Sequence, residues 1–142
     1  MTPGCLFCAI AAGDVPATMV ARDDDVAAFL DARPVFKGHV LVVPRTHVPT
    51  LSDMPPAALG TLFAAVQRIA RAVEIGLGAD GTFVAMNNKV SQSVPHLHVH
   101  VVPRKKKDGL RGFFWPRTKY ADDAARDAVA ARIAAVLDGG AA

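Results

Sequence analysis

Three histidines alternate with apolar residues between positions 96 and 102, in the run His-Leu-His-Val-His-Val-Val. Residues two apart on a β-strand project to the same face, so the run predicts a strand with His96, His98 and His100 on one face. Leucine and valine then occupy the other face. A single histidine on a strand is usually a satisfied polar group, but three on one face predict a functional site, because imidazoles can attack, donate, accept or bind metal near neutral pH.

Hydrophobic periodicity predicts further strands and helices around this strand. Strands are expected over residues 18–22, 26–30, 38–43 and 82–86, a long helix over 55–76, and helices over 5–12 and 122–137. A chain of 142 residues without repeats or linkers fits one domain. We therefore expect a single α+β domain over 1–142, with an antiparallel sheet of about five strands, one long helix and a C-terminal helix.

Composition limits the classes of partner. Hydrophobic residues make up 51% of the chain and charged residues 20%, which is typical of a soluble globular protein. The net charge of +3 is compatible with an anionic ligand but does not require nucleic acid. No apolar run is long enough to span a membrane, and the first residues lack the features of a secretory signal. We expect a cytoplasmic protein that binds neither nucleic acid nor membrane.

Both cysteines lie in one short motif, Cys5-Leu6-Phe7-Cys8. In a reducing compartment such a pair indicates metal binding or redox activity more than a structural disulfide. A thioredoxin-like motif would follow a strand, and no strand is predicted before Cys5. The remaining alternative is a pair of small, partly buried apolar side chains.

Together these motifs resemble the histidine-triad (HIT) family. The resemblance rests on the triad strand, on Cys5–Cys8, on Phe29-Leu30-Asp31 and on residues 38–44, in the same order along the chain, and it covers about residues 5–104. Residues 105–142 match less clearly and form a C-terminal extension. The resemblance implies a HIT-like fold, a homodimer whose sheet continues across the interface, and a hydrolase or transferase that attacks the α-phosphate of a purine nucleotide.

The resemblance assigns His98 as the nucleophile. An imidazole that attacks phosphorus must keep one nitrogen free of hydrogen, and a backbone carbonyl bonded to the other nitrogen would fix that tautomer. His96 and His100 would stabilise charge and donate protons, His39 would join the histidine cluster, and Ser93 would donate to the phosphate or the leaving group. Taken singly, His39 is more often structural, and Ser93 can equally be a turn residue.

Nucleotide-binding residues also follow from the resemblance. Asp31 corresponds to a ribose-binding carboxylate, although an aspartate at this position is also an ordinary turn former. One of two neighbouring asparagines, Asn87 or Asn88, corresponds to a phosphate ligand. Gln92 and Ser93 match a polar pair before the triad. Four apolar residues resemble the base pocket, although periodicity alone places them in the core: Phe7, Ile10, Phe29 and Leu30.

The family also has a zinc-binding set to which this chain is similar. It comprises Cys5, Cys8, His47 and His96. Two thiolates and two imidazoles make a closed tetrahedral site, so the zinc would be structural, with no coordination position left for a substrate. No organic cofactor is expected.

Several alternatives stay open at the level of sequence. The chain could be a non-catalytic purine-nucleotide-binding module or a dinucleoside polyphosphate phosphorylase. Metal-assisted hydrolysis is less favoured, because no clear carboxylate lies near the triad. The basic run over residues 104–107 predicts a solvated loop that could attract a polyphosphate, and the aromatic segment over residues 111–116 predicts packing, with a possible contribution to the substrate mouth.

Overall fold

The computed structural model describes residues 2–111 and 117–139 of the chain. It comprises two compact units, Met1–Asp108 and Gly109–Ala142. The first unit carries the sheet and the second carries the C-terminal helix.

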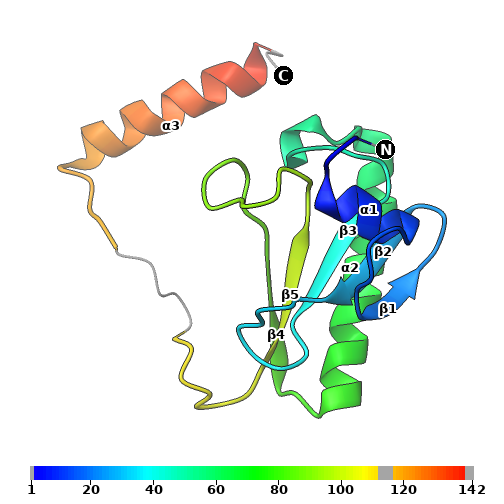
Figure 1. The fold of residues 1–142 in the computed structure, drawn as a ribbon. Helices are drawn as coiled ribbons and strands as arrows, with labels where there is room; N and C mark the ends of the chain where they lie inside the picture. The colour runs from blue at the N-terminus through cyan, green and yellow to red at the C-terminus, as the bar shows by residue number, and fades with distance from the viewer. Residues whose placement is uncertain (1, 112–116, 140–142) are drawn as a thin grey trace. The chain divides into compact units, whose positions relative to one another are not determined.

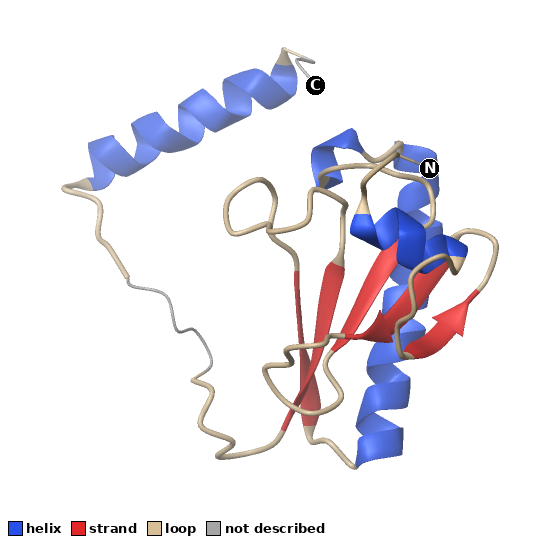
Figure 2. Cartoon of the chain, viewed as in Figure 1, coloured by secondary structure: helices blue, strands red, loops and turns tan. Residues whose placement is uncertain are grey.

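The first unit contains a five-stranded, fully antiparallel sheet (Figures 1 and 2). Its order is β1-β2-β3-β5-β4. The strands are β1 (Met19–Arg22), β2 (Val26–Leu30), β3 (Val40–Pro44), β4 (Gly81–Ala85) and β5 (Val99–Arg104). This confirms the predicted α+β class and the predicted antiparallel sheet.

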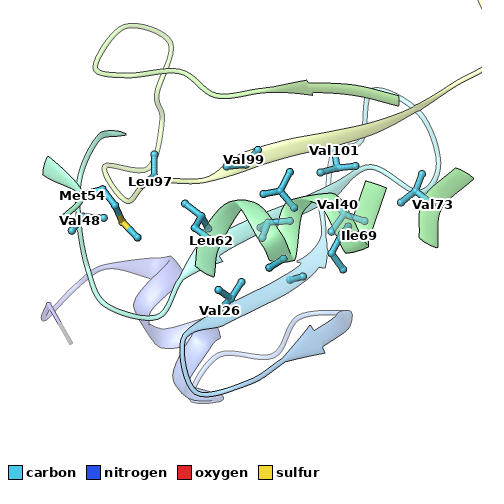
Figure 3. Close-up of a cluster of buried hydrophobic side chains, with 14 residues drawn as sticks. Val26, Val40, Val48, Met54, Leu62, Ile69, Val73, Leu97, Val99 and Val101 are labelled. Atoms are coloured by element: carbon cyan, nitrogen blue, oxygen red, sulfur yellow. The ribbon is translucent and has the colours of Figure 1, made fainter. Parts of the chain in front are cut away.

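One long helix, α2 (Pro56–Leu77), covers one face of the sheet. Leu62, Ile69 and Val73 of this helix lie in one buried cluster with residues of β3 and β5, as Figure 3 shows. The predicted helix ran over 55–76 and differs by one residue at each end. Gly76 lies within the helix, and Gly78 ends it in the left-handed conformation, with φ of 61°.

A short helix, α1 (Leu6–Ala12), covers the opposite face, in front of β2 and β3 in Figure 1. The Sγ atom of Cys5 accepts a hydrogen bond from the amide of Cys8 and so caps its first turn. Phe7 and Ile10 are buried against Phe29 and Leu41 of the sheet. A 3₁₀ turn, η1 (Leu51–Asp53), precedes α2.

The histidine strand begins later than the sequence predicts. The predicted strand ran from His96 to Val102, whereas β5 runs from Val99 to Arg104. Val42 pairs with Val99, so the register would bring Pro44 opposite Leu97, and Pro44 has no amide hydrogen for the ladder. The amide of Leu97 instead donates to the carbonyl of Val48, at 2.7 Å.

The predicted alternation of faces holds despite this difference. Leu97, Val99 and Val101 are fully buried in the cluster beneath α2 (Figure 3). His96, His98 and His100 therefore face away from α2, because residues two apart share a face of extended backbone. The apolar residues fix the backbone on which the histidines stand.

The second unit contains α3 (Asp123–Asp138). The side chain of Asp122 accepts a hydrogen bond from the amide of Ala125 and caps its first turn. Ile133 and Val136 on this helix are exposed. Among the helices in the described part of the chain, none has the length and apolar character needed to cross a membrane.

Candidate active site

His98 presents one ring nitrogen free of hydrogen. Its Nδ1 atom lies 2.7 Å from the backbone carbonyl oxygen of His96. A carbonyl only accepts, so Nδ1 carries the hydrogen and Nε2 keeps its lone pair in the neutral ring. His98 is 6% exposed, and its ring packs edge-on against Phe7, with ring centres 5.1 Å apart. The geometry gives a fixed imidazole with a free Nε2 lone pair.

His100 and His39 form a hydrogen-bonded pair. The amide of Val35 donates to Nδ1 of His39, at 3.2 Å, so neutral His39 carries its hydrogen on Nε2. Nε2 of His39 lies 2.9 Å from Nδ1 of His100 and donates to it. Neutral His100 then carries its own hydrogen on Nε2, which makes that nitrogen a hydrogen-bond donor.

Burial keeps these two rings neutral near pH 7. It lowers the pKa of His100 from 6.5 to about 4, with smaller contributions from His98 and His39. Burial also lowers the pKa of His39, while the charge of Asp31 opposes that shift. Both rings are therefore neutral near neutral pH, and the amide of Val35 favours the hydrogen positions given above.

A second cluster brings together the four residues that the resemblance assigned to zinc: Cys5, Cys8, His47 and His96. Sγ of Cys5 and Sγ of Cys8 lie 3.4 and 3.5 Å from Nδ1 of His96. Nδ1 of His47 lies 3.4 Å from Sγ of Cys8 and 3.3 Å from Nδ1 of His96. The four ligand atoms come from the N-cap and first turn of α1, from the segment after β3 and from the segment before β5.

These distances fit a tetrahedral metal ion. Bonds of about 2.3 Å to sulfur and about 2.1 Å to nitrogen give tetrahedral edges of roughly 3.6 Å between sulfur and nitrogen and roughly 3.4 Å between nitrogens. The observed separations of 3.3–3.5 Å are close to these edges. Nε2 of His96 donates to the carbonyl of Pro44, at 2.7 Å, which leaves the Nδ1 lone pair for a metal. The donor set is that of a closed structural site.

The two clusters meet at His96. Its Nδ1 faces the cysteines, its Nε2 faces Pro44, and its carbonyl accepts from His98. Both ring nitrogens of His96 therefore have a partner in this structure, and its predicted role as a proton donor stays a prediction. In His98 and His100, the ring hydrogen bonds engage Nδ1, and Nε2 is the nitrogen that can face a substrate.

The four residues that the resemblance assigns to the base pocket lie on α1 and β2. Phe7, Ile10 and Phe29 are buried in the cluster beneath α1, and the rings of Phe7 and Phe29 meet edge-on with centres 5.4 Å apart. Leu30 is 37% exposed and offers apolar surface at the end of β2. Asp31 follows it directly, and its Oδ1 accepts from the amide of Arg33.

The predicted phosphate-side residues lie in the exposed loop before the triad. Oδ1 of Asn88 accepts from the amide of Leu51, while Nδ2 of Asn87 donates to the carbonyl of Ser91. Gln92 donates to the carbonyl of Pro49 and accepts from the amide of Lys89. These contacts hold the loop in place. Ser93 is exposed and lies three residues before His96.

Three groups that shape the site could not be found from sequence patterns. They are the carbonyls of Pro44 and Val48 and the amide of Val35, each a backbone atom that contacts a triad segment or His39. Every residue except proline carries both kinds of backbone group, so the residue type gives no signal.

The basic segment after β5 is an ordered loop. Arg104 makes a two-point ion pair with Asp108, with N···O distances of 2.6 and 3.0 Å. Lys105–Lys107 are exposed, as the predicted solvated loop requires. The aromatic part of the predicted segment 111–116 lies outside the described residues.

Comparisons with known proteins all point to the same protein family. The family model of the HIT domain matches residues 12–107. The protein hit of Bacillus subtilis is 40% identical over 121 residues, which span 84% of this chain and 82% of that protein. Adenosine 5'-monophosphoramidase hnt1 of Schizosaccharomyces pombe is 31% identical over 79% of this chain and 83% of that protein. Adenylylsulfatase HINT3 of Arabidopsis thaliana is 34% identical over 75% of this chain and 55% of that protein.

Solved structures agree with this assignment. A HIT family member from Bacillus subtilis superposes with a TM-score of 0.82 at 36% identity, covering 92% of this chain and 95% of that one. A zinc-bound histidine-triad protein from Mycobacterium smegmatis has a TM-score of 0.72 at 41% identity, covering 93% and 97%. The family match, the fold and the histidine cluster lead to one conclusion: this chain belongs to the HIT domain family.

Proposed function

We propose that this chain is a nucleotide hydrolase or transferase that attacks the α-phosphate of a nucleoside phosphoramidate or dinucleoside polyphosphate. The single observation that carries the proposal is the hydrogen bond from Nδ1 of His98 to the carbonyl of His96, which leaves Nε2 unprotonated. Relatives named as an adenosine 5'-monophosphoramidase and an adenylylsulfatase support the substrate class.

The reaction proceeds in two displacements. Nε2 of His98 forms a bond to the α-phosphorus, and the bond from phosphorus to the leaving group breaks. The carbonyl of His96 stabilises the positive charge that develops on the ring. Water then attacks the phosphorus, the bond to Nε2 breaks, and a nucleoside monophosphate such as AMP is released.

Donors around the phosphate complete the proposed site. His100 donates from Nε2 to a non-bridging oxygen, and Ser93 donates to the phosphate or supplies a proton to the leaving group. His39 holds His100, as the 2.9 Å hydrogen bond supports. Asn87 and Gln92 rearrange to the phosphate when substrate binds, and Asp31 binds the ribose. The purine lies against the apolar group Phe7, Ile10, Phe29 and Leu30.

The Cys/His cluster is proposed to hold structural zinc. Cys5, Cys8, His47 and His96 are its ligands, and the tetrahedral edges support this assignment. The bound zinc would supply a cross-link between α1 and the triad segment, and no step of the reaction uses it. Because the chain's own side chains carry the reaction, we propose no organic cofactor. Thiolate ligands stay reduced in the cytoplasm, which we propose as the compartment.

AMP release from adenosine 5'-phosphoramidate tests this function. We expect turnover by the native chain and a loss of at least about a thousandfold in kcat for His98→Asn. The asparagine amide can still donate to the carbonyl of His96 but offers no nucleophilic nitrogen, so its fold should persist. Asp25→Asn, on the exposed turn between β1 and β2, is the control and should keep native turnover.

Other outcomes of the same assay point elsewhere. Equal turnover by His98→Asn and the native chain would contradict the proposed nucleophile. Tight AMP binding without any turnover would favour a binding module. Transfer of the nucleotidyl group to inorganic phosphate instead of water would favour a phosphorylase.

A further inference from the structure

The loop between β2 and β3 carries three groups that converge on His39. Asp31 begins the loop, the amide of Val35 lies in its middle, and His39 ends it. The amide of Asp31 donates to the carbonyl of His39, at 2.9 Å, so the two ends of the loop are tied together. One loop therefore carries both a carboxylate and the ring that contacts His100.

Val35 and Asp31 favour different positions for the hydrogen of His39. The amide of Val35 donates to Nδ1 and favours a ring with its hydrogen on Nε2. Oδ2 of Asp31 lies 3.7 Å from the same Nδ1, and its negative charge favours a hydrogen there. The side chain of His39 is only 4% exposed, so water screens this competition weakly.

The position of this hydrogen decides what His100 can do. With hydrogen on Nε2 of His39, Nδ1 of His100 accepts and Nε2 of His100 is a donor. With hydrogen on Nδ1 of His39, Nε2 of His39 accepts from Nδ1 of His100, and Nε2 of His100 has no hydrogen to donate. Each ring carries one proton in both arrangements. In the change from the second arrangement to the first, the proton between the rings moves from Nδ1 of His100 to Nε2 of His39. Nδ1 of His39 loses a proton to water, and Nε2 of His100 gains one from water.

We propose that Asp31 is a positioning residue for His100, acting through His39, and that ribose hydroxyls bound to Asp31 shift His100 to its donor tautomer. The ribose part rests on the proposed function. The side chain of Asp31 is 23% exposed, so a ligand can reach it. Hydroxyls that donate to Oδ2 weaken its attraction for a hydrogen on Nδ1 of His39, and the amide of Val35 then prevails. Ribose recognition thereby increases the fraction of chains competent for phosphate binding at His100.

We call this coupling of Asp31 to His100 through His39 the relay. Nitrogen NMR of the native chain, labelled at its histidines, tests the relay directly. We expect a mixture of His100 tautomers in the free chain, and the form with hydrogen on Nε2 once adenosine is bound. Bound 2',3'-dideoxyadenosine should leave the mixture unchanged. Asp31→Asn keeps an acceptor for the amide of Arg33 but removes the charge, and should give the donor form without any ligand. Asp25→Asn is the matched control and should behave as the native chain.

Kinetics give the second readout. Removing both ribose hydroxyls from the phosphoramidate should lower kcat roughly tenfold in the native chain and leave kcat unchanged in Asp31→Asn. A change in KM alone would contradict the coupling while leaving the proposed function intact.

Failure of the relay and failure of the function are distinguishable. If Asp31→Asn has the native mixture of His100 tautomers, the relay is wrong, whatever the nucleoside does. If Asp31→Asn shifts the tautomers but bound adenosine does not, the ribose part is wrong. If no nucleoside binds, the proposed function fails, and the Asp31→Asn spectrum still decides the relay.

Discussion

Three of the five histidines have a ring nitrogen bonded to a backbone group. Val35 donates to His39, while His96 and His98 donate to the carbonyls of Pro44 and His96. Backbone groups cannot titrate, so each contact favours one tautomer of the neutral ring over a wide pH range. This is how three chemically equivalent side chains, His39, His96 and His98, come to hold their ring nitrogens in different states.

The low pKa of His100 predicts a loss of stability in acid. The folded chain holds this ring neutral down to about pH 4, while the unfolded chain protonates it near pH 6.5. Between these values the unfolded state binds more protons, so the free energy of unfolding falls as the pH falls. By this shift, the protonation of His100 lowers the free energy of unfolding by about 3 kcal/mol between neutral pH and a pH below 4.

Urea unfolding at pH 7 and pH 4.5 measures this effect. His100→Gln removes the titrating ring, so it should lose less stability between the two pH values than the native chain does. An equal loss in both chains would show that His100 does not carry the acid sensitivity.

At the scale of elements, α1 depends on contacts outside itself. Seven residues are too few for a helix to be stable alone. The apolar cluster beneath it and the Cys/His cluster at its start hold it against β2 and β3. Because Phe7 of α1 packs against His98, the position of this helix also limits the movement of the proposed nucleophile.

Metal removal is expected to loosen α1. Chelation, or His47→Ala, should lower Tm by roughly 5–10 °C and increase hydrogen exchange over residues 6–12, because the cross-link to the triad segment is lost. Thr46→Ala, beside His47 but outside the ligand set, is the control and should retain the native Tm. Unchanged exchange over 6–12 in a chain shown to have lost its metal would contradict the proposed cross-link.

The strands show how far sequence reasoning reaches at this scale. The alternation of histidine and apolar residues correctly predicted two faces, because side-chain direction follows from extended backbone alone. It wrongly predicted the start of β5, because strand pairing also depends on the partner strand. β3 ends at Pro44, which the register would place opposite Leu97 and which has no amide hydrogen for the ladder. The spacing of the cysteines alone could not show that His47 and His96 lie beside them, because these contacts form only in the fold.

At the scale of the whole molecule, the two faces of the sheet carry different kinds of side chain. One face of the sheet is filled by α2 and apolar side chains, and the other carries the histidines and the cysteines' helix. The HIT-like fold of the first unit could be predicted from motif order. That residues 1–142 act as a single domain stays a prediction, because the chain divides into two compact units.

We propose a homodimer in which the sheet continues across the outer edge of β4, as the resemblance implies. β4 is an edge strand in the described sheet, with β5 as its one neighbour there, and Val84 on it is 42% exposed. Light scattering should give about twice 14.9 kDa for the native chain and the monomer mass for Val84→Lys. Val20→Lys, on the opposite edge strand β1 with 46% exposure, is the control and should stay dimeric. A monomeric native chain would contradict the proposed dimer.

The proposed reaction depends most on a covalent bond between Nε2 of His98 and the α-phosphorus. Rapid acid-free quenching of the native chain with adenosine 5'-phosphoramidate, followed by intact-mass and peptide analysis, tests it most directly. We predict an adenylyl adduct on the peptide that contains His98, which disappears as AMP accumulates and which His98→Asn never forms. AMP release without any adduct, or an adduct on another residue of the native chain, would contradict the account.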